Sequence, residues 1–123
     1  MTKHVLIADD EPNIVISLEF LMRREGHRVS VARDGDAALA AIRCERPDLV
    51  LLDVMMPGRS GMEVCQAVRE DPALAGVKIL MLSAKGRDTD LAKGTALGAD
   101  AYVTKPFSTR ELADKVRELL AGA

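Results

Sequence analysis

The most constraining feature of this sequence is the regular alternation of short apolar segments with longer segments whose apolar residues recur at helical spacing. Five segments have the length and composition of strands, and they are His4–Ala8, Arg28–Val31, Leu49–Leu52, Val77–Leu82 and Ala101–Thr104. Strands that alternate with helices form a parallel sheet covered on both faces. The pattern therefore predicts an α/β fold with three layers.

Helix signals fill the intervals between the expected strands. Two Ser-x-x-Glu capping boxes, at Ser60 and Ser108, each indicate where a helix begins. The helices are expected from Pro12 to Gly26, from Asp34-Gly35 onward, from about Gly61 to Glu70, between Arg87 and Leu97, and after Ser108. Pro47 closes the connection between the second helix and the third strand. The fourth has the weakest signal, because Gly94 lies inside it and costs about 1 kcal/mol relative to Ala.

The composition of the strands favours one order of the sheet. His4–Ala8 and Leu49–Leu52 are uniformly apolar and should be central. Arg28–Val31 alternates polar and apolar residues, and Ala101–Thr104 is short, as edge strands often are. Of the two commonest doubly wound orders, 2-1-3-4-5 and 3-2-1-4-5, this favours 2-1-3-4-5. Ligands would then bind beyond the carboxyl ends of the first and third strands.

Length and composition limit the classes of protein to consider. The chain has 123 residues, 48% of them apolar and 29% charged, and we expect a single domain over 1–123. Its net charge of −2, without a basic cluster, argues against direct nucleic-acid binding. The sequence predicts no signal peptide and no membrane span, and Cys44 and Cys65 lack metal-ligand spacing. We therefore expect a cytoplasmic protein with reduced thiols.

Three carboxylates follow the two central strands. Asp9 and Asp10 come after the first strand, and Asp53 comes after the third. Asp53 lies seven residues before Ser60, the cap of the next helix, and is therefore too far away to cap that helix itself. Asp10 as a cap of the first helix would leave the other two acids unexplained. Two carboxylates about 4 Å apart repel by about 4 kcal/mol at an effective dielectric near 20. A divalent cation would offset this repulsion, and Mg²⁺ fits best because it accepts both carboxylate and phosphate oxygens.

Two further strand ends carry groups suited to a phosphoryl group. Ser83 ends the fourth strand with a hydroxyl, and Lys105 follows the fifth with a compact positive charge. An aspartate can itself be a nucleophile and form an aspartyl phosphate. These residues predict phosphoryl transfer that depends on positioning and charge neutralisation.

Four motifs together resemble the receiver domains of response regulators, the CheY-like family. In order along the whole chain they are Asp9-Asp10-Glu11-Pro12, Leu52–Gly58, Leu82-Ser83-Ala84 and Lys105-Pro106-Phe107. The resemblance implies a flavodoxin-like doubly wound (βα)5 fold. It also implies a phosphorylation-dependent switch of a two-component system, a regulator rather than an enzyme, although it assists its own phosphorylation and dephosphorylation. The implied cofactor is Mg²⁺, with Mn²⁺ as a substitute.

The same resemblance assigns roles to the acidic residues. Asp53 matches the phosphoacceptor, which takes a phosphoryl group from a phosphohistidine. Asp10 matches the main carboxylate ligand of Mg²⁺, and Asp9 supports the metal partly through water. Asp53 and the backbone carbonyl of Met55 also match metal ligands. In the alternative interpretation, Met55 only fills a gap in the packing with its side chain.

The resemblance also implies a switch and its partners. Ser83 matches the hydroxyl that turns toward the phosphoryl group, and Lys105 matches the lysine that pairs with it. Tyr102 matches an aromatic that turns inward on activation, with simple packing as the alternative. The Lys105–Pro106 bond matches one that is cis in the family.

The expected phosphoryl donor is a sensor histidine kinase or a phosphotransfer protein. A downstream protein or output domain is expected to bind the face formed by the fourth helix, fifth strand and fifth helix. Leu91 and Ala101 stand where OmpR-type receivers commonly carry charges. We therefore expect a monomer or a weak, phosphorylation-dependent dimer.

Three other classes of protein stay open at this point. A flavin- or nucleotide-binding domain would place a Gly- or Ser/Thr-rich phosphate cradle after the first strand, where Asp9-Asp10-Glu11 stands. A phosphatase with an aspartate nucleophile would carry a second acid at the position of Met55. An inactive receiver that acts only in docking would usually have lost part of the Asp, Ser and Lys set, which is complete here.

Overall fold

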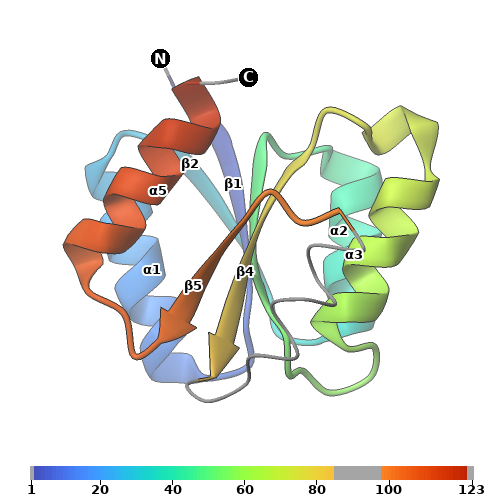
Figure 1. Ribbon diagram of the computed structural model, residues 1–123, viewed down its shortest axis with the longest axis horizontal. Coiled ribbons are helices and arrows are strands. Elements are labelled where there is room, and N and C mark those ends of the chain that lie inside the picture. Colours follow the sequence, from blue (N-terminus) through green and yellow to red (C-terminus); the bar gives the residue numbers. More distant parts are fainter. Residues whose placement is uncertain (1, 85–97, 122–123) are drawn as a thin grey trace.

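The computed structural model describes residues 2–84 and 98–121 (Figure 1). Within these residues the strands are β1 (His4–Ala8), β2 (Arg28–Ala32), β3 (Leu49–Asp53), β4 (Lys78–Ala84) and β5 (Ala101–Lys105). They form one parallel sheet in the order β2-β1-β3-β4-β5. The predicted α/β class and strand order are confirmed.

The helices cover both faces of this sheet. Those described are α1 (Pro12–Arg24), α2 (Gly35–Glu45), α3 (Gly61–Glu70) and α5 (Thr109–Ala121), with a short 3-10 helix, η1 (Pro72–Leu74), that the sequence patterns did not indicate. Figure 1 shows α1 and α5 on one face and α2 and α3 on the other. The helix expected between Arg87 and Leu97 lies outside the described residues.

Four strands extend one or two residues beyond their predicted carboxyl ends. β2 continues to Ala32, β3 to Asp53, β4 to Ala84 and β5 to Lys105. The reason is continued pairing with neighbouring strands, since Asp53 lies opposite Leu82 and Ala84 opposite Lys105. Polar residues at the carboxyl edge therefore belong to the sheet itself, which places their side chains more rigidly than a loop would.

Local capping signals account for where the helices begin. Ser60 and Glu63 form the predicted capping box at the start of α3, and the Asp34 side chain accepts a hydrogen bond from the first turn of α2. The N-cap residue of α1 is Glu11, whose side chain makes no capping hydrogen bond. Asp10 is thus not the cap of α1, and the simpler role considered for it is not observed.

The core is divided by the sheet into two apolar clusters. Every residue of β1 and β3 is buried, as expected for central strands of a sheet covered on both faces. One cluster packs against α2 and α3 and the other against α1 and α5. No helix in the described ranges 2–84 and 98–121 is both long and apolar enough to cross a lipid bilayer.

Candidate functional site

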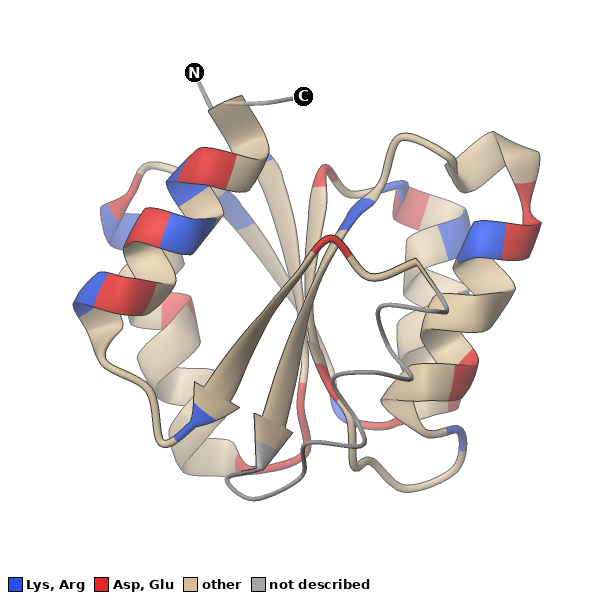
Figure 2. Ribbon diagram, viewed as in Figure 1, with Lys and Arg blue, Asp and Glu red and all other residues tan. Residues whose placement is uncertain are grey.

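The strand order brings the three acidic residues together at the carboxyl edge of the sheet. Ala8 and Leu52 are paired between β1 and β3, so the residues that follow them, Asp9 and Asp53, are neighbours. Among the described residues, carboxylate oxygens of Asp9, Asp10 and Asp53 lie within 4.8 Å of one another. Figure 2 shows acidic segments at the lower edge of the sheet, where the arrows of β4 and β5 also end.

The backbone holds one carboxylate oxygen of each buried acid. Asp9 is fully buried and Asp53 is 5% exposed, whereas Asp10 is exposed. Asp9 Oδ1 accepts a hydrogen bond of 2.9 Å from the Glu11 backbone N–H. Asp53 Oδ1 accepts one of 3.2 Å from the Met55 backbone N–H. The Oδ2 atoms of both residues are thereby left for contacts within the cluster.

Lys105 is the cation of this cluster. Its Nζ lies 2.8 Å from Asp9 Oδ2, 3.0 Å from Glu11 Oε1 and 3.5 Å from Asp53 Oδ2. Burial favours the neutral amine, but the contacts with Asp9 and Glu11, together with the charge of Asp53, outweigh burial and raise the pKa of Lys105. The sequence patterns had not indicated that Glu11 would share this lysine, although it directly follows the two acids.

The local environment makes Asp53 an unusually weak acid. Burial is the main cause, and the charge of Asp9 adds to it, so the pKa of Asp53 rises from 3.8 to about 6. Lys105 and the Met55 backbone N–H act in the opposite direction but do not cancel the rise. A nearby cation would therefore favour the ionised, nucleophilic form of Asp53.

The acidic cluster fits a hard divalent cation. Asp9 Oδ2 is buried, and among the described residues it faces the Lys105 ammonium at 2.8 Å rather than a backbone N–H. The three clustered carboxylates and Glu11, with one lysine among them, also leave an excess of negative charge. Oxygen donors and excess negative charge are what Mg²⁺ requires, and it needs only one or two carboxylates.

The other predicted site residues occupy the same edge or its neighbourhood. Ser83 is 1% exposed on β4 and follows Leu82, which is paired with Asp53. The Lys105–Pro106 peptide bond is cis. Tyr102 is half-buried on β5 and packs against the core cluster on the α2 and α3 side. These positions leave the assigned roles of Ser83 and Tyr102 as predictions.

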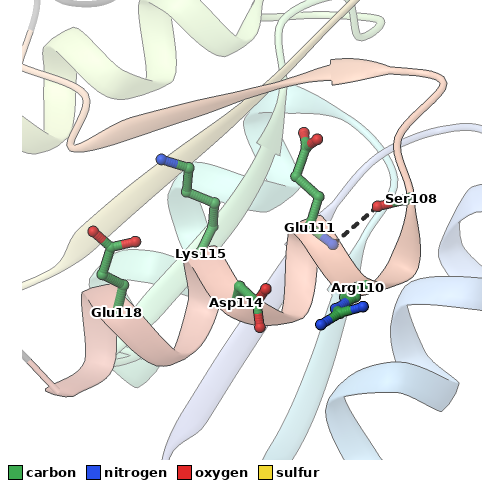
Figure 3. Close-up of a pocket in the computed structure, with 6 residues that line it drawn as sticks. All are labelled: Ser108, Arg110, Glu111, Asp114, Lys115 and Glu118. Carbon is green, nitrogen blue, oxygen red and sulfur yellow. Dashed lines mark hydrogen bonds between the residues drawn. The ribbon is translucent and has the colours of Figure 1, made fainter.

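A hollow on α5 is separate from the acidic cluster. It measures about 330 Å³ and is lined by mostly charged side chains (Figure 3), namely Ser108, Arg110, Glu111, Asp114, Lys115 and Glu118. The Ser108 hydroxyl accepts a hydrogen bond of 3.0 Å from the Glu111 backbone N–H, as its predicted capping role requires. None of the clustered acids, nor Lys105, lines this hollow.

Comparison with solved structures shows close similarity over the whole chain. A response regulator from Chloroflexus aurantiacus is 36% identical and superimposes with a TM-score of 0.93, over 98% of this chain and 99% of that one. The receiver domain of a signal transduction histidine kinase from Syntrophus aciditrophicus is 29% identical, with a TM-score of 0.91 over 98% of this chain and 92% of its own.

A third similar structure contains a metal. It is the receiver domain of the sensor histidine kinase PA1611 from Pseudomonas aeruginosa, solved with a magnesium ion coordinated in its active-site cleft. It is 25% identical, with a TM-score of 0.89 over 98% of this chain and 99% of that one. The family model of the response regulator receiver domain also matches residues 5–117. The chain therefore belongs to the response regulator receiver domain family.

Proposed function

We propose that Asp53 accepts a phosphoryl group from the phosphohistidine of a sensor histidine kinase or a phosphotransfer protein. Family membership supports a phosphoacceptor role in two-component signalling. The observation that carries the residue assignment is the position of Asp53, buried between two further acids and 3.5 Å from the Lys105 ammonium. The Asp53 carboxylate is accordingly the nucleophile. Residues 1–123 form a single receiver domain that acts as a regulator.

Asp10, Asp53 and the Met55 backbone carbonyl would hold Mg²⁺, with Asp9 contributing through water. The ion, for which Mn²⁺ would substitute, supplies neutralisation of the negative charge that gathers around the transferred group. A similar receiver solved with magnesium in its cleft supports this assignment. The residues of the chain then align the acceptor oxygen with the phosphorus atom.

In the proposed reaction the bond between phosphorus and the imidazole nitrogen of the donor breaks as a bond to an Asp53 oxygen forms. Lys105 leaves part of its contact with Asp9 and Glu11 and pairs with an oxygen of the arriving phosphoryl group. Ser83 donates a hydrogen bond to another oxygen. Tyr102, on the adjacent strand β5, changes its packing in response, which alters the surface offered to a downstream protein or output domain.

Mass spectrometry of the intact protein tests the proposal. Incubation with acetyl phosphate and Mg²⁺ should add one phosphoryl group, and EDTA should prevent the addition. Asp53→Asn should abolish it, whereas the matched control Asp114→Asn, on the exposed face of α5, should not. A phosphoryl group that still appears on Asp53→Asn, or that appears without a divalent ion, would contradict the assignment.

A further inference from the structure

We propose that the first turn of α2 positions the loop between β3 and α3 for metal and phosphoryl binding, with Gly35 as its main positioning residue. The proposal rests on the proposed function, because it concerns the Met55 carbonyl that would ligate Mg²⁺. Helix α2 contributes no side chain to the cluster of Asp9, Asp10 and Asp53. The sequence patterns assign the start of this helix no role beyond beginning a helix. Figure 1 shows α2 packed beside α3, on the face where this loop ends.

Two polar contacts tie the loop to α2. The backbone N–H of Gly35 donates to the Pro57 carbonyl at 3.1 Å. Arg59 Nε donates to Asp36 Oδ1 at 2.8 Å. Both contacts come from the first residues of α2 and reach the part of the loop that follows Met55. The loop is therefore attached to a helix that precedes β3 in the sequence.

Gly35 is required by this contact rather than by its backbone conformation. Its φ lies outside the positive region in which glycine is favoured, so another residue could adopt the same backbone angles. A Cβ at Gly35 would, however, overlap the Arg59 carbonyl group. Because the overlapping atoms are backbone, they could not swing aside as a side chain would, and the loop would have to move.

The opposite end of the loop is held by α3. The Gly61 N–H donates to the Val54 carbonyl at 2.9 Å. A Cβ at Gly61 would overlap the backbone of Asp53. Met55 lies between the two attachments, and its side chain is 55% exposed, so it provides little packing of its own. The position of the Met55 carbonyl relative to Asp53 consequently depends on α2 as well as on α3.

The ion pair between Asp36 and Arg59 allows positioning to be separated from stability. Their side chains are 67% and 48% exposed, and exposed pairs of this kind contribute little to folding. Removing the positive charge of Arg59 would by itself favour a bound cation. A loss of Mg²⁺ affinity in Arg59→Ala would thus point to displacement of the loop and not to the altered charge.

The test is isothermal titration of Mg²⁺ into Gly35→Ala and Arg59→Ala, together with initial rates of phosphorylation by acetyl phosphate over a range of Mg²⁺ concentrations. Substituting a residue that orients a metal ligand typically lowers the affinity for the metal by about 10–100-fold. We expect Gly35→Ala to weaken Mg²⁺ binding about tenfold and Arg59→Ala a few-fold, with Arg59→Lys restoring much of the loss. At saturating Mg²⁺ the rate should return close to that of the unmodified protein.

The matched control is Gly76→Ala, because a Cβ at Gly76 would meet nothing within 4 Å. If Gly35→Ala does not fold, Arg59→Ala and Arg59→Lys decide the outcome. The inference is overturned if the unmodified protein binds Mg²⁺ and is phosphorylated while Gly35→Ala and Arg59→Ala both bind the ion with the affinity of Gly76→Ala. A lowered melting temperature without a change in Mg²⁺ affinity would also overturn it. Failure of the unmodified protein itself to bind Mg²⁺ and accept a phosphoryl group would instead reject the proposed function.

Discussion

Replacing Asp53 with Asn should stabilise the metal-free protein at neutral pH, because it removes a charge that the fold holds at a cost. The pKa of Asp53 rises from 3.8 to about 6 on folding, mainly through burial and then through the charge of Asp9. A tenfold change in an ionisation equilibrium corresponds to about 1.4 kcal/mol. The ionised form of Asp53 therefore lowers the free energy of unfolding by about 3 kcal/mol.

The sign of the pH dependence follows from which state releases its proton first. Below pH 3.8 the carboxyl is protonated in both the folded and the unfolded chain, so Asp53 has no charge to bury. Between 3.8 and about 6 the unfolded chain ionises while the folded one keeps its proton, so stability from this group falls as the pH rises. Above about pH 6 the full cost is present. The amide of the Asp53→Asn variant would carry no charge at any of these pH values.

Urea unfolding followed by far-ultraviolet circular dichroism, with EDTA present, measures the effect. The stability advantage of Asp53→Asn should grow from about 1 kcal/mol at pH 4.5 to about 3 kcal/mol at pH 7.5. Added Mg²⁺ should reduce it, while the exposed control Asp114→Asn should show no comparable trend. An Asp53→Asn variant that is no more stable at pH 7.5, or whose advantage does not vary with pH, would refute the electrostatic reasoning.

Further predictions concern the lysine and the core. In the metal-free protein, carboxyl ¹³C NMR should show a higher pKa for Asp53 in Lys105→Met, since the lysine lowers it. The same titration should show a lower pKa of Asp53 in Glu11→Gln, which removes the negative charge that competes for Lys105 at 3.0 Å; unchanged or opposite displacements would contradict this. Leu51→Ala, at a fully buried position, should cost about 2–5 kcal/mol in urea unfolding. Ile16→Ala, 64% exposed, should cost under about 0.5 kcal/mol, and equal costs would argue against the packing described.

The predicted elements were most accurate where a local signal defines them. The capping box at Ser60 placed the start of α3 at Gly61, and uniform apolarity placed β1 and β3 at the centre of the sheet. The carboxyl ends of β2, β3, β4 and β5 were less accurate. Whether a polar residue such as Asp53 is the last of a strand depends on the partner opposite it, here Leu82, and not on its own preference.

The candidate site divides in the same way. Residue type and position after a strand were enough to select Asp9, Asp10, Asp53 and Lys105, because parallel strands bring their carboxyl ends to one edge. The additional acceptor Glu11 was missed, although its oxygen lies 3.0 Å from the lysine Nζ, between the 2.8 Å of Asp9 and the 3.5 Å of Asp53. Its position directly after Asp9 and Asp10 was the one available signal, and a glutamate just before a helix is otherwise ordinary.

The sequence by itself determined the α/β class and the acids, hydroxyl and lysine at the strand ends, since these depend on neighbours within a few residues. It also indicated the strand order, because apolar composition shows which strands are buried on both sides. Only the tertiary structure decided how these groups share charge and space. Lys105 and Glu11 are 94 residues apart in the chain, and Arg59 and Asp36 are 23 apart. Their distances, the raised pKa of Asp53 and the close approach at Gly35 arise from packing between separate elements, where a difference of about 1 Å decides whether a contact exists.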